Sequence, residues 1–140
     1  MVERRREKRL KVELPVSLSY LDNPLIYART QNISRLGSYI EIEQDIPLGV
    51  KLDITIEIPA YSNDQSLIGS LKCQVDVFRC SLLREAQPGK VYGLGVFFTV
   101  FSEPQDQNKL SKYIDFLIVK EQEDVKRAMQ SWREKRKKKH

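Results

Sequence analysis

Polar and apolar side chains alternate residue by residue along several parts of the chain, and this pattern limits the fold more than any other feature. In residues 10–20 every even position is apolar or aromatic, and every odd position is polar or proline. Residues 50–58 alternate in the same way. Because successive side chains of a β-strand point to opposite faces, the pattern indicates strands with one buried face. Further strands are expected over residues 26–33, 38–42, 67–79 and 91–100.

Turn-forming residues separate these six segments. The turns are Asp22-Asn23-Pro24, Ser34-Arg35-Leu36-Gly37, Pro47-Leu48-Gly49, Ser62-Asn63-Asp64 and Gln87-Pro88-Gly89. Glycine, proline, asparagine, aspartate and serine each favour the backbone angles of tight turns. Short strands with turns between them are typical of antiparallel sheets that close on themselves. The sequence therefore predicts a mainly β protein, a small six-stranded antiparallel β-barrel.

The hydrophobic period changes at Ser102-Glu103-Pro104-Gln105, which has the residue types that begin a helix. The apolar residues that follow recur every three or four positions: Leu110, Tyr113, Ile114, Leu117 and Ile118. They predict a C-terminal α-helix that closes over the barrel. Beyond residue 121 a sparser stripe consists of Val125, Met129 and Trp132. This stripe has three interpretations: packing on its own barrel, a homodimer through the C-terminal helix, or contact with another protein.

The length of 140 residues corresponds to one domain with short tails. No apolar run approaches the roughly 20 residues that span a bilayer. The N-terminal residues MVERRREKRL lack the apolar stretch of a secretory signal, which predicts a cytoplasmic protein. The two cysteines, Cys73 and Cys80, and the single histidine, His140, do not have the spacing of metal ligands. Two reduced thiols and no metal are therefore expected.

The net charge of +5 is distributed unevenly along the chain. Residues 3–11 carry six basic and two acidic side chains, and residues 126–139 carry eight basic and one acidic. The stretch between them carries 10 basic and 16 acidic side chains. A nucleic-acid-binding domain more often has a basic body with one electropositive face. The acidic body with basic ends favours a local anion site.

Two segments are candidates for that anion site. Residues 4–9, with the sequence RRREKR, supply arginine side chains that bind phosphate oxygens and guanine edges in a forked geometry. Residues 32–37, with the sequence NISRLG, place Asn32 and Ser34 on one face at a strand end, before Gly37. Taken alone, the first segment is more typical of a solvated basic tail than of a binding site, and the second is more typical of an ordinary turn.

Taken together, Arg5-x-x-x-Arg9 and Asn32-x-Ser34-x-x-Gly37 resemble the signature of PilZ domains, R-x-x-x-R followed by D/N-x-S-x-x-G. The resemblance implies a receptor for cyclic di-GMP, a bacterial second messenger. It implies that Arg5 and Arg9 contact phosphates and guanine edges or stack on the bases. Asn32 and Ser34 would hydrogen-bond guanine edges or a phosphate, and Gly37 would let the loop pass close to the ligand.

The resemblance covers residues 3–120, and the G-V-x-F-like stretch at residues 95–98 belongs to it. It implies that the chain has three parts. Residues 1–9 would be a flexible arginine-rich arm, and residues 10–120 the β-barrel with its C-terminal helix. Residues 121–140 would be a helical extension with a basic tail.

Arg4 stands directly before the R-x-x-x-R motif. Family members with this further arginine tend to bind a stacked pair of ligands, so two cyclic di-GMP molecules per domain are expected. No cofactor is expected, and no enzyme, because His140 lies at the chain end and the cysteines lack a histidine partner. The expected function is a receptor that signals to a downstream protein partner through ordering of the arm. The alternatives are a small nucleic-acid-binding barrel, against which the acidic body argues, and a protein-interaction module of the same fold.

Overall fold

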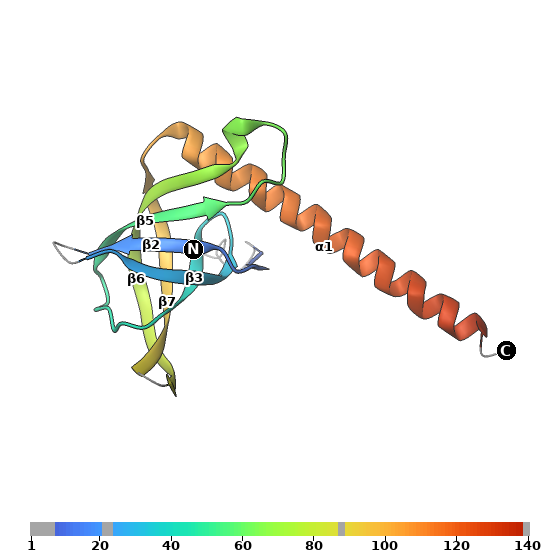
Figure 1. The fold of residues 1–140 in the computed structure, drawn as a ribbon, viewed down its shortest axis with the longest axis horizontal. Coiled ribbons are helices and arrows are strands. Elements are labelled where there is room, and N and C mark those ends of the chain that lie inside the picture. The colour runs from blue at the N-terminus through green and yellow to red at the C-terminus, as the bar shows by residue number, and fades with distance from the viewer. Residues whose placement is uncertain (1–7, 21–23, 87–88, 139–140) are drawn as a thin grey trace.

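The computed structural model describes residues 8–20, 24–86 and 89–138 (Figure 1). The elements in these residues are strands, one short 3-10 helix and one long α-helix. In chain order they are β1 (Leu10–Lys11), β2 (Pro15–Ser19), β3 (Ile26–Ile33), β4 (Gly37–Ile42), β5 (Lys51–Ile58), η2 (Gln65–Leu67), β6 (Gly69–Ala86), β7 (Gly89–Phe101) and α1 (Pro104–Lys138).

The strands form one antiparallel sheet that closes into a barrel. Hydrogen bonding follows the order β3, β2, β5, β6, β7, β4, and β4 pairs back with β3. Strand β1 lies outside this ring and pairs with β3 through Leu10↔Ile33 and Lys11↔Asn32. The expected six-stranded antiparallel barrel with a C-terminal helix is confirmed, and β1 is an addition to it.

The strand expected over residues 10–20 is interrupted, and Thr30 of β3 fills the interruption. The Thr30 hydroxyl accepts a hydrogen bond from the Leu14 amide at 2.9 Å and donates one to the Val12 carbonyl at 2.6 Å. This buried side chain bridges the ladder where the backbone of residues 12–14 leaves it. Apolar residues still alternate across the gap, so β1 and β2 look like one strand in the sequence.

Strands β6 and β7 are longer than expected because bulges interrupt their alternation. The ladder between them changes register between Gln74 and Val75, between Val77 and Arg79, and between Leu82 and Arg84. Each bulge inserts a residue and bends the strand, so the period of two does not continue through it. Strand β6 therefore runs to Ala86, beyond the end expected at residue 79.

The core fills the barrel with the apolar residues of the alternating strands. Its fully buried members include Leu18, Ile40, Leu52, Ile54, Ile56, Leu71, Val75, Leu94 and Val96. Helix α1 covers this core through Leu110, Tyr113 and Ile114, as the sequence predicts. Tyr61, which packs against the core, contacts the Tyr113 ring edge-on, with 5.2 Å between ring centroids. Aliphatic and aromatic packing therefore fixes the first turns of α1 on the barrel.

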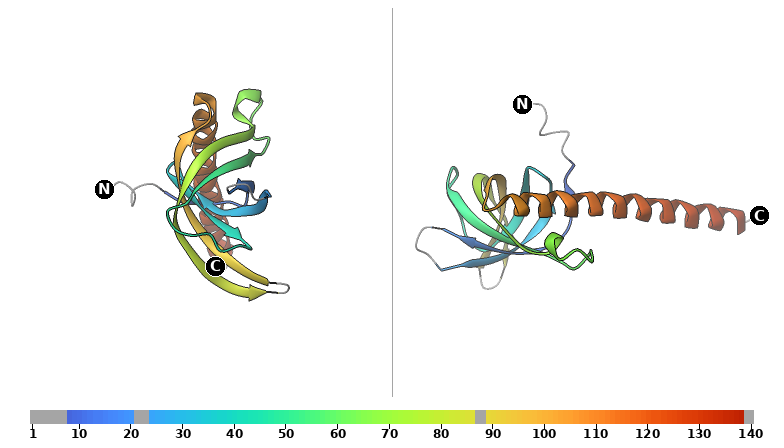
Figure 2. Two further views of the ribbon diagram at one scale, coloured as in Figure 1. Left: turned by 90° about the vertical axis from the view of Figure 1, so that its left-hand side faces the viewer. Right: turned by 90° about the horizontal axis from the view of Figure 1, so that it is seen from above.

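Helix α1 continues without a break far past the barrel (Figure 1 and Figure 2). The residue pair Leu117 and Ile118 still packs partly against the core. From Gln122 to Arg136 every side chain is exposed. This part of α1 thus does not pack on its own barrel, which removes one of the three interpretations of the second stripe.

Candidate functional site

The turn between β3 and β4 is held by the Ser34 side chain. The Ser34 hydroxyl accepts hydrogen bonds from the Leu36 amide at 3.1 Å and the Gly37 amide at 3.2 Å. The Ser34 amide donates to the Gly37 carbonyl at 2.9 Å. Because Ser34 is only 3% exposed, its hydroxyl serves mainly to shape the turn.

Gly37 is required by the close approach of β4 to β7. A Cβ atom at this position would lie 2.1 Å from the carbonyl oxygen of Val96. Gly37 pairs directly with Phe97, and the Leu36 carbonyl accepts a hydrogen bond from the Phe98 amide at 2.9 Å. The turn is therefore docked against the backbone of β7. This packing requires glycine at position 37. The requirement is independent of the close approach to a ligand that the family resemblance implies.

Arg9 and Asn32 come together because β1 pairs with β3. The Arg9 Nη1 atom donates a hydrogen bond to Asn32 Oδ1 at 3.4 Å, and the Arg9 side chain is exposed. Asn32 is partly buried, opposite Lys11 on β1 and Tyr39 on β4. Strand β1 thus brings Arg9, the last residue of the expected arm, to the start of the turn. The Arg9 guanidinium stays accessible to an anion.

Of the six expected site residues, four lie in the described part of the chain: Arg9, Asn32, Ser34 and Gly37. Arg9 and Asn32 are in contact, and Ser34 and Gly37 form the adjoining turn. Arg4 and Arg5 lie outside the described residues.

Two ion pairs that the sequence analysis missed join both halves of the site to α1. Lys8, next to Arg9, pairs with Glu121, and Arg35 of the turn pairs with Asp115. All four side chains are at least one-third exposed. Such pairs contribute only about 0.2–1 kcal/mol each to stability. Their partners are separated by 113 and 80 residues, so no local pattern could have indicated them.

An aromatic pair flanks the turn on the β6–β7 side. The rings of Phe78 and Phe97 stack with 4.2 Å between centroids, and Phe78 is 38% exposed. A Cβ atom at Gly95 would lie 2.7 Å from the Phe78 ring, so that glycine makes room for it. Phe97 is the pairing partner of Gly37, which places the aromatic pair beside the turn.

The sequence model of the PilZ domain family matches residues 3–116, most of the chain. The chain belongs to the PilZ domain family. The members of this family are effectors that bind cyclic di-GMP and are not enzymes. No curated protein matches the chain.

Several solved structures share the fold of this PilZ domain at low sequence identity. The PilZ domain of YcgR from Escherichia coli with c-di-GMP superposes with a TM-score of 0.63 and 17% identity, covering 88% of this chain and 98% of that one. The Bacillus subtilis inhibitor of motility, MotI/DgrA, has a TM-score of 0.63 and 16% identity, covering 84% and 51%. The K. pneumonia MrkH–c-di-GMP complex has a TM-score of 0.66 and 13% identity, covering 84% and 52%. The chain thus spans about half the length of MotI and MrkH.

Within the described ranges, this PilZ domain contains no cluster of three or more histidine, cysteine, aspartate or glutamate side chains placed to hold a metal. Over the same ranges, no helix has the length and apolar character needed to span a membrane.

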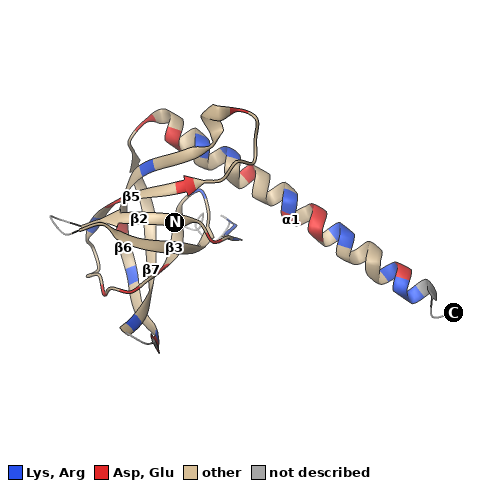
Figure 3. Ribbon diagram, in the orientation of Figure 1, with Lys and Arg blue, Asp and Glu red and all other residues tan. Residues whose placement is uncertain are grey.

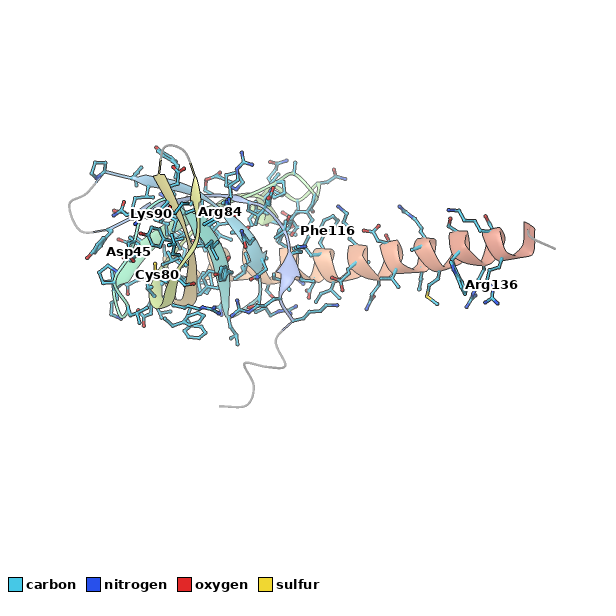
Figure 4. All side chains as sticks on the ribbon, turned by 90° about the horizontal axis from the view of Figure 1, so that it is seen from below. Asp45, Cys80, Arg84, Lys90, Phe116 and Arg136 are labelled. Atoms are coloured by element: carbon cyan, nitrogen blue, oxygen red, sulfur yellow. The ribbon has the colours of Figure 1, made fainter. Side chains whose placement is uncertain are left out.

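The two cysteines of the PilZ domain are free thiols with weak nucleophilic character. Burial raises the pKa of the Cys73 thiol from 9.0 to about 12. Burial also raises the pKa of Cys80, whose sulfur donates to Asp45 Oδ1 at 3.4 Å (Figure 4). Because the thiolate is the reactive form, neither cysteine is prepared for nucleophilic chemistry.

Alkylation of Cys73 in the folded protein is expected to be at least about 1,000-fold slower at pH 8 than in the unfolded chain, because a thiol with a pKa of about 12 is almost fully protonated there. The rate should rise with pH. The same shift predicts that the free energy of unfolding falls as the pH rises from 9 towards 12, since the unfolded thiol ionises first. Mass spectrometry of a Cys80→Ser variant after iodoacetamide treatment measures the rate. Stoichiometric labelling of the folded variant within minutes at pH 8 would contradict this expectation.

Proposed function

We propose that this PilZ domain is a non-enzymatic receptor for cyclic di-GMP that transmits ligand binding to a protein partner. The observation that carries the proposal is the 3.4 Å hydrogen bond between Arg9 and Asn32, which joins the two halves of the family signature in space. The YcgR and MrkH structures with c-di-GMP, which share this fold, support the same ligand.

The chemistry of the residues suits an anionic dinucleotide. The exposed Arg9 guanidinium can bind two phosphate oxygens or the O6 and N7 atoms of guanine. The Asn32 amide lies within its reach and offers both a donor and an acceptor to a guanine edge. Phe78 and Phe97 give an aromatic surface beside the turn on which a base can stack.

Isothermal titration calorimetry with cyclic di-GMP tests the proposed function. We expect saturable binding at micromolar protein that weakens as salt rises, because the contacts are charge-assisted. A single-stranded oligonucleotide serves as the comparison for the nucleic-acid alternative. A folded protein that binds the oligonucleotide but gives no heat with cyclic di-GMP would overturn the proposal.

Ligand binding is proposed to order the arm and to recruit Arg4 and Arg5, which lie outside the described residues. Arg4→Ala is expected to lower the calorimetric stoichiometry from two ligands per domain to one, because Arg4 is the residue assigned to the second ligand. The remaining ligand should still bind. An unchanged count in this variant would contradict the role of Arg4.

The signal to a partner is proposed to pass through α1. Lys8 and Arg35 flank the site, and each is paired with an acidic residue of that helix, Glu121 and Asp115. The ligand phosphates attract the same two cations. Binding therefore competes with both ion pairs and loosens the electrostatic ties between the site and the helix.

Glu121→Gln and Asp115→Asn are each expected to tighten cyclic di-GMP binding by about two- to five-fold, because an exposed ion pair that competes with the ligand is worth up to about 1 kcal/mol. Calorimetry at low salt measures the change. Glu123→Gln removes the same charge from an exposed position of α1 and controls for net charge. Equal affinities in all three variants would argue against competition.

A further inference from the structure

Strand register places one arginine of β6, Arg79, on the same outer surface as the candidate site. Asn32 of β3 pairs with Tyr39 of β4, which pairs with Gly95 of β7. Gly95 in turn pairs with Arg79. Directly opposed residues of antiparallel strands have their side chains on the same face of the sheet. The four residues therefore form one row across the outside of the barrel, with the Arg9 contact of Asn32 at one end and Arg79 at the other.

The Arg79 side chain extends back across β7 towards Asn32. Its Cζ atom lies 6.0 Å from the centroid of the Tyr39 ring. Because Tyr39 is the residue directly opposite Asn32, the guanidinium reaches the strand next to Asn32, and neighbouring strands are only about 5 Å apart. A separation of about 6 Å is the outer limit of a cation–π contact, so the exposed Arg79 guanidinium is held weakly and can move to a ligand.

The surface next to Arg79 consists of aromatic rings that lie on the backbone of β7. A Cβ atom at Gly93 would clash with the Tyr39 hydroxyl oxygen, so that glycine makes room for the tyrosine ring. Gly95 makes room for the ring of Phe78 in the same way. Phe78 directly precedes Arg79 and is exposed. A planar base can stack on such a surface and present its edge to the arginine.

The charges around Arg79 leave its guanidinium available. Strand β6 carries three basic residues and β7 carries one, and they lie apart along the strands (Figure 3). The acidic neighbour of Tyr39 on the outer face of β4 is Glu41, which lies two residues further along the strand. The Glu41 carboxylate already accepts hydrogen bonds from Gln31 and Arg84. Among the residues that the structure describes, no carboxylate forms an ion pair with Arg79.

We propose that Arg79 is a further ligand-binding residue, which donates to the O6 and N7 atoms of a guanine of cyclic di-GMP while that base stacks on the Phe78 ring. The role of Arg79 rests on the proposed function. Arg9 and Arg79 hold the ligand from opposite sides, and Tyr39 lies between them. Because adenine has an amino group in place of O6, Arg79 also makes the site selective for guanine.

Calorimetry with two ligands tests the guanine contact of Arg79. The ligands are cyclic di-GMP and an analogue with 7-deazaguanine bases, which lack the N7 acceptor. Arg79→Ala is expected to weaken cyclic di-GMP binding by about 5- to 100-fold, because it removes a forked donor to a guanine edge. The wild type should bind the analogue more weakly than cyclic di-GMP, and this penalty should be at least about 5-fold smaller in Arg79→Ala. A penalty of the same size in both proteins, as a contact with phosphate alone would give, would overturn the proposal.

Lys72→Ala is the matched control, because it removes one positive charge from an exposed position of the same strand. It should bind both ligands like the wild type, and equal losses in Lys72→Ala and Arg79→Ala would overturn the proposal. Arg79→Lys keeps the charge without the fork, so its penalty for the analogue should fall as in Arg79→Ala. A folded wild type that gives no heat with cyclic di-GMP would overturn the proposed function and this role together. A wild type that binds cyclic di-GMP no better than Arg79→Ala does would overturn the role of Arg79 alone.

Discussion

Arg9→Ala is expected to raise the dissociation constant for cyclic di-GMP by about 100-fold, equivalent to about 3 kcal/mol. Of the two arginines of the signature, Arg9 is the one that the structure describes. Its guanidinium is exposed, and its Nη1 atom lies 3.4 Å from Asn32 Oδ1. Removing it takes away a forked, charged donor for phosphate or guanine and leaves the Asn32 amide without its neighbour. Calorimetry on the purified variant measures the effect.

The matched control for Arg9→Ala is Arg127→Ala. Arg127 is an exposed arginine on the part of α1 beyond the barrel, away from the site, so the variant has the same net charge as Arg9→Ala. Its affinity should stay within about two-fold of the wild type, because distant exposed charges are screened by salt. Similar losses in both variants would show that only overall charge matters, and would contradict a site at Arg9.

Gly37→Ala is expected to lower the free energy of unfolding by about 3 kcal/mol and the Tm by roughly 10 °C. The added Cβ would lie 2.1 Å from the Val96 carbonyl oxygen. A backbone carbonyl cannot rotate away as a side chain can, so β4 must separate from β7 beside the turn. Because that movement also displaces the turn at Ser34, cyclic di-GMP binding should weaken in the protein that remains folded.

Gly89→Ala provides the comparison for this effect. A Cβ at Gly89, the first residue of β7, would meet nothing within 4 Å. Its Tm should therefore stay close to that of the wild type, or rise slightly because alanine restricts the unfolded chain. Thermal unfolding followed by circular dichroism measures both variants. A Gly37→Ala protein as stable as Gly89→Ala would contradict the assigned packing of β4 on β7.

The barrel could be predicted from the sequence because its strands have one buried face, which gives a period of two. The predicted strand bounds were wrong where another interaction replaced the backbone hydrogen bonds between strands. Thr30 bridges the gap between β1 and β2 with its hydroxyl, and the apolar positions pass through the gap unchanged. The bulges of β6 have the opposite effect, since they interrupt the period while the strand continues to Ala86.

The candidate site was predicted only in part, for a similar reason. The signature indicates Arg9 and Asn32 by residue type and spacing, and the pairing of β1 with β3 explains their contact. The ion pairs of Lys8 and Arg35 depend on the direction in which α1 crosses the barrel. Packing of aliphatic and aromatic side chains on the core decides that direction, and no local sequence pattern encodes it.

Helix α1 has a different role in its first turns, in its middle and in its last part. Its first turns close the core through Leu110 and Ile114. Its middle carries Asp115 and Glu121, which pair with the turn and with the root of the arm. Its last part, from Gln122 to Arg136, is exposed beyond the barrel. One continuous helix thus runs from the core, past the proposed ligand site, to an exposed segment.

A crystal structure of this chain with cyclic di-GMP would show whether the signature residues bind the ligand. We expect the ligand against the turn between β3 and β4, with the Arg9 guanidinium and the Asn32 amide within hydrogen-bond distance of it. Arg5 should contact the same ligand from the arm. A ligand bound to another surface, or one that touches neither Arg9 nor Asn32, would contradict the proposed binding site.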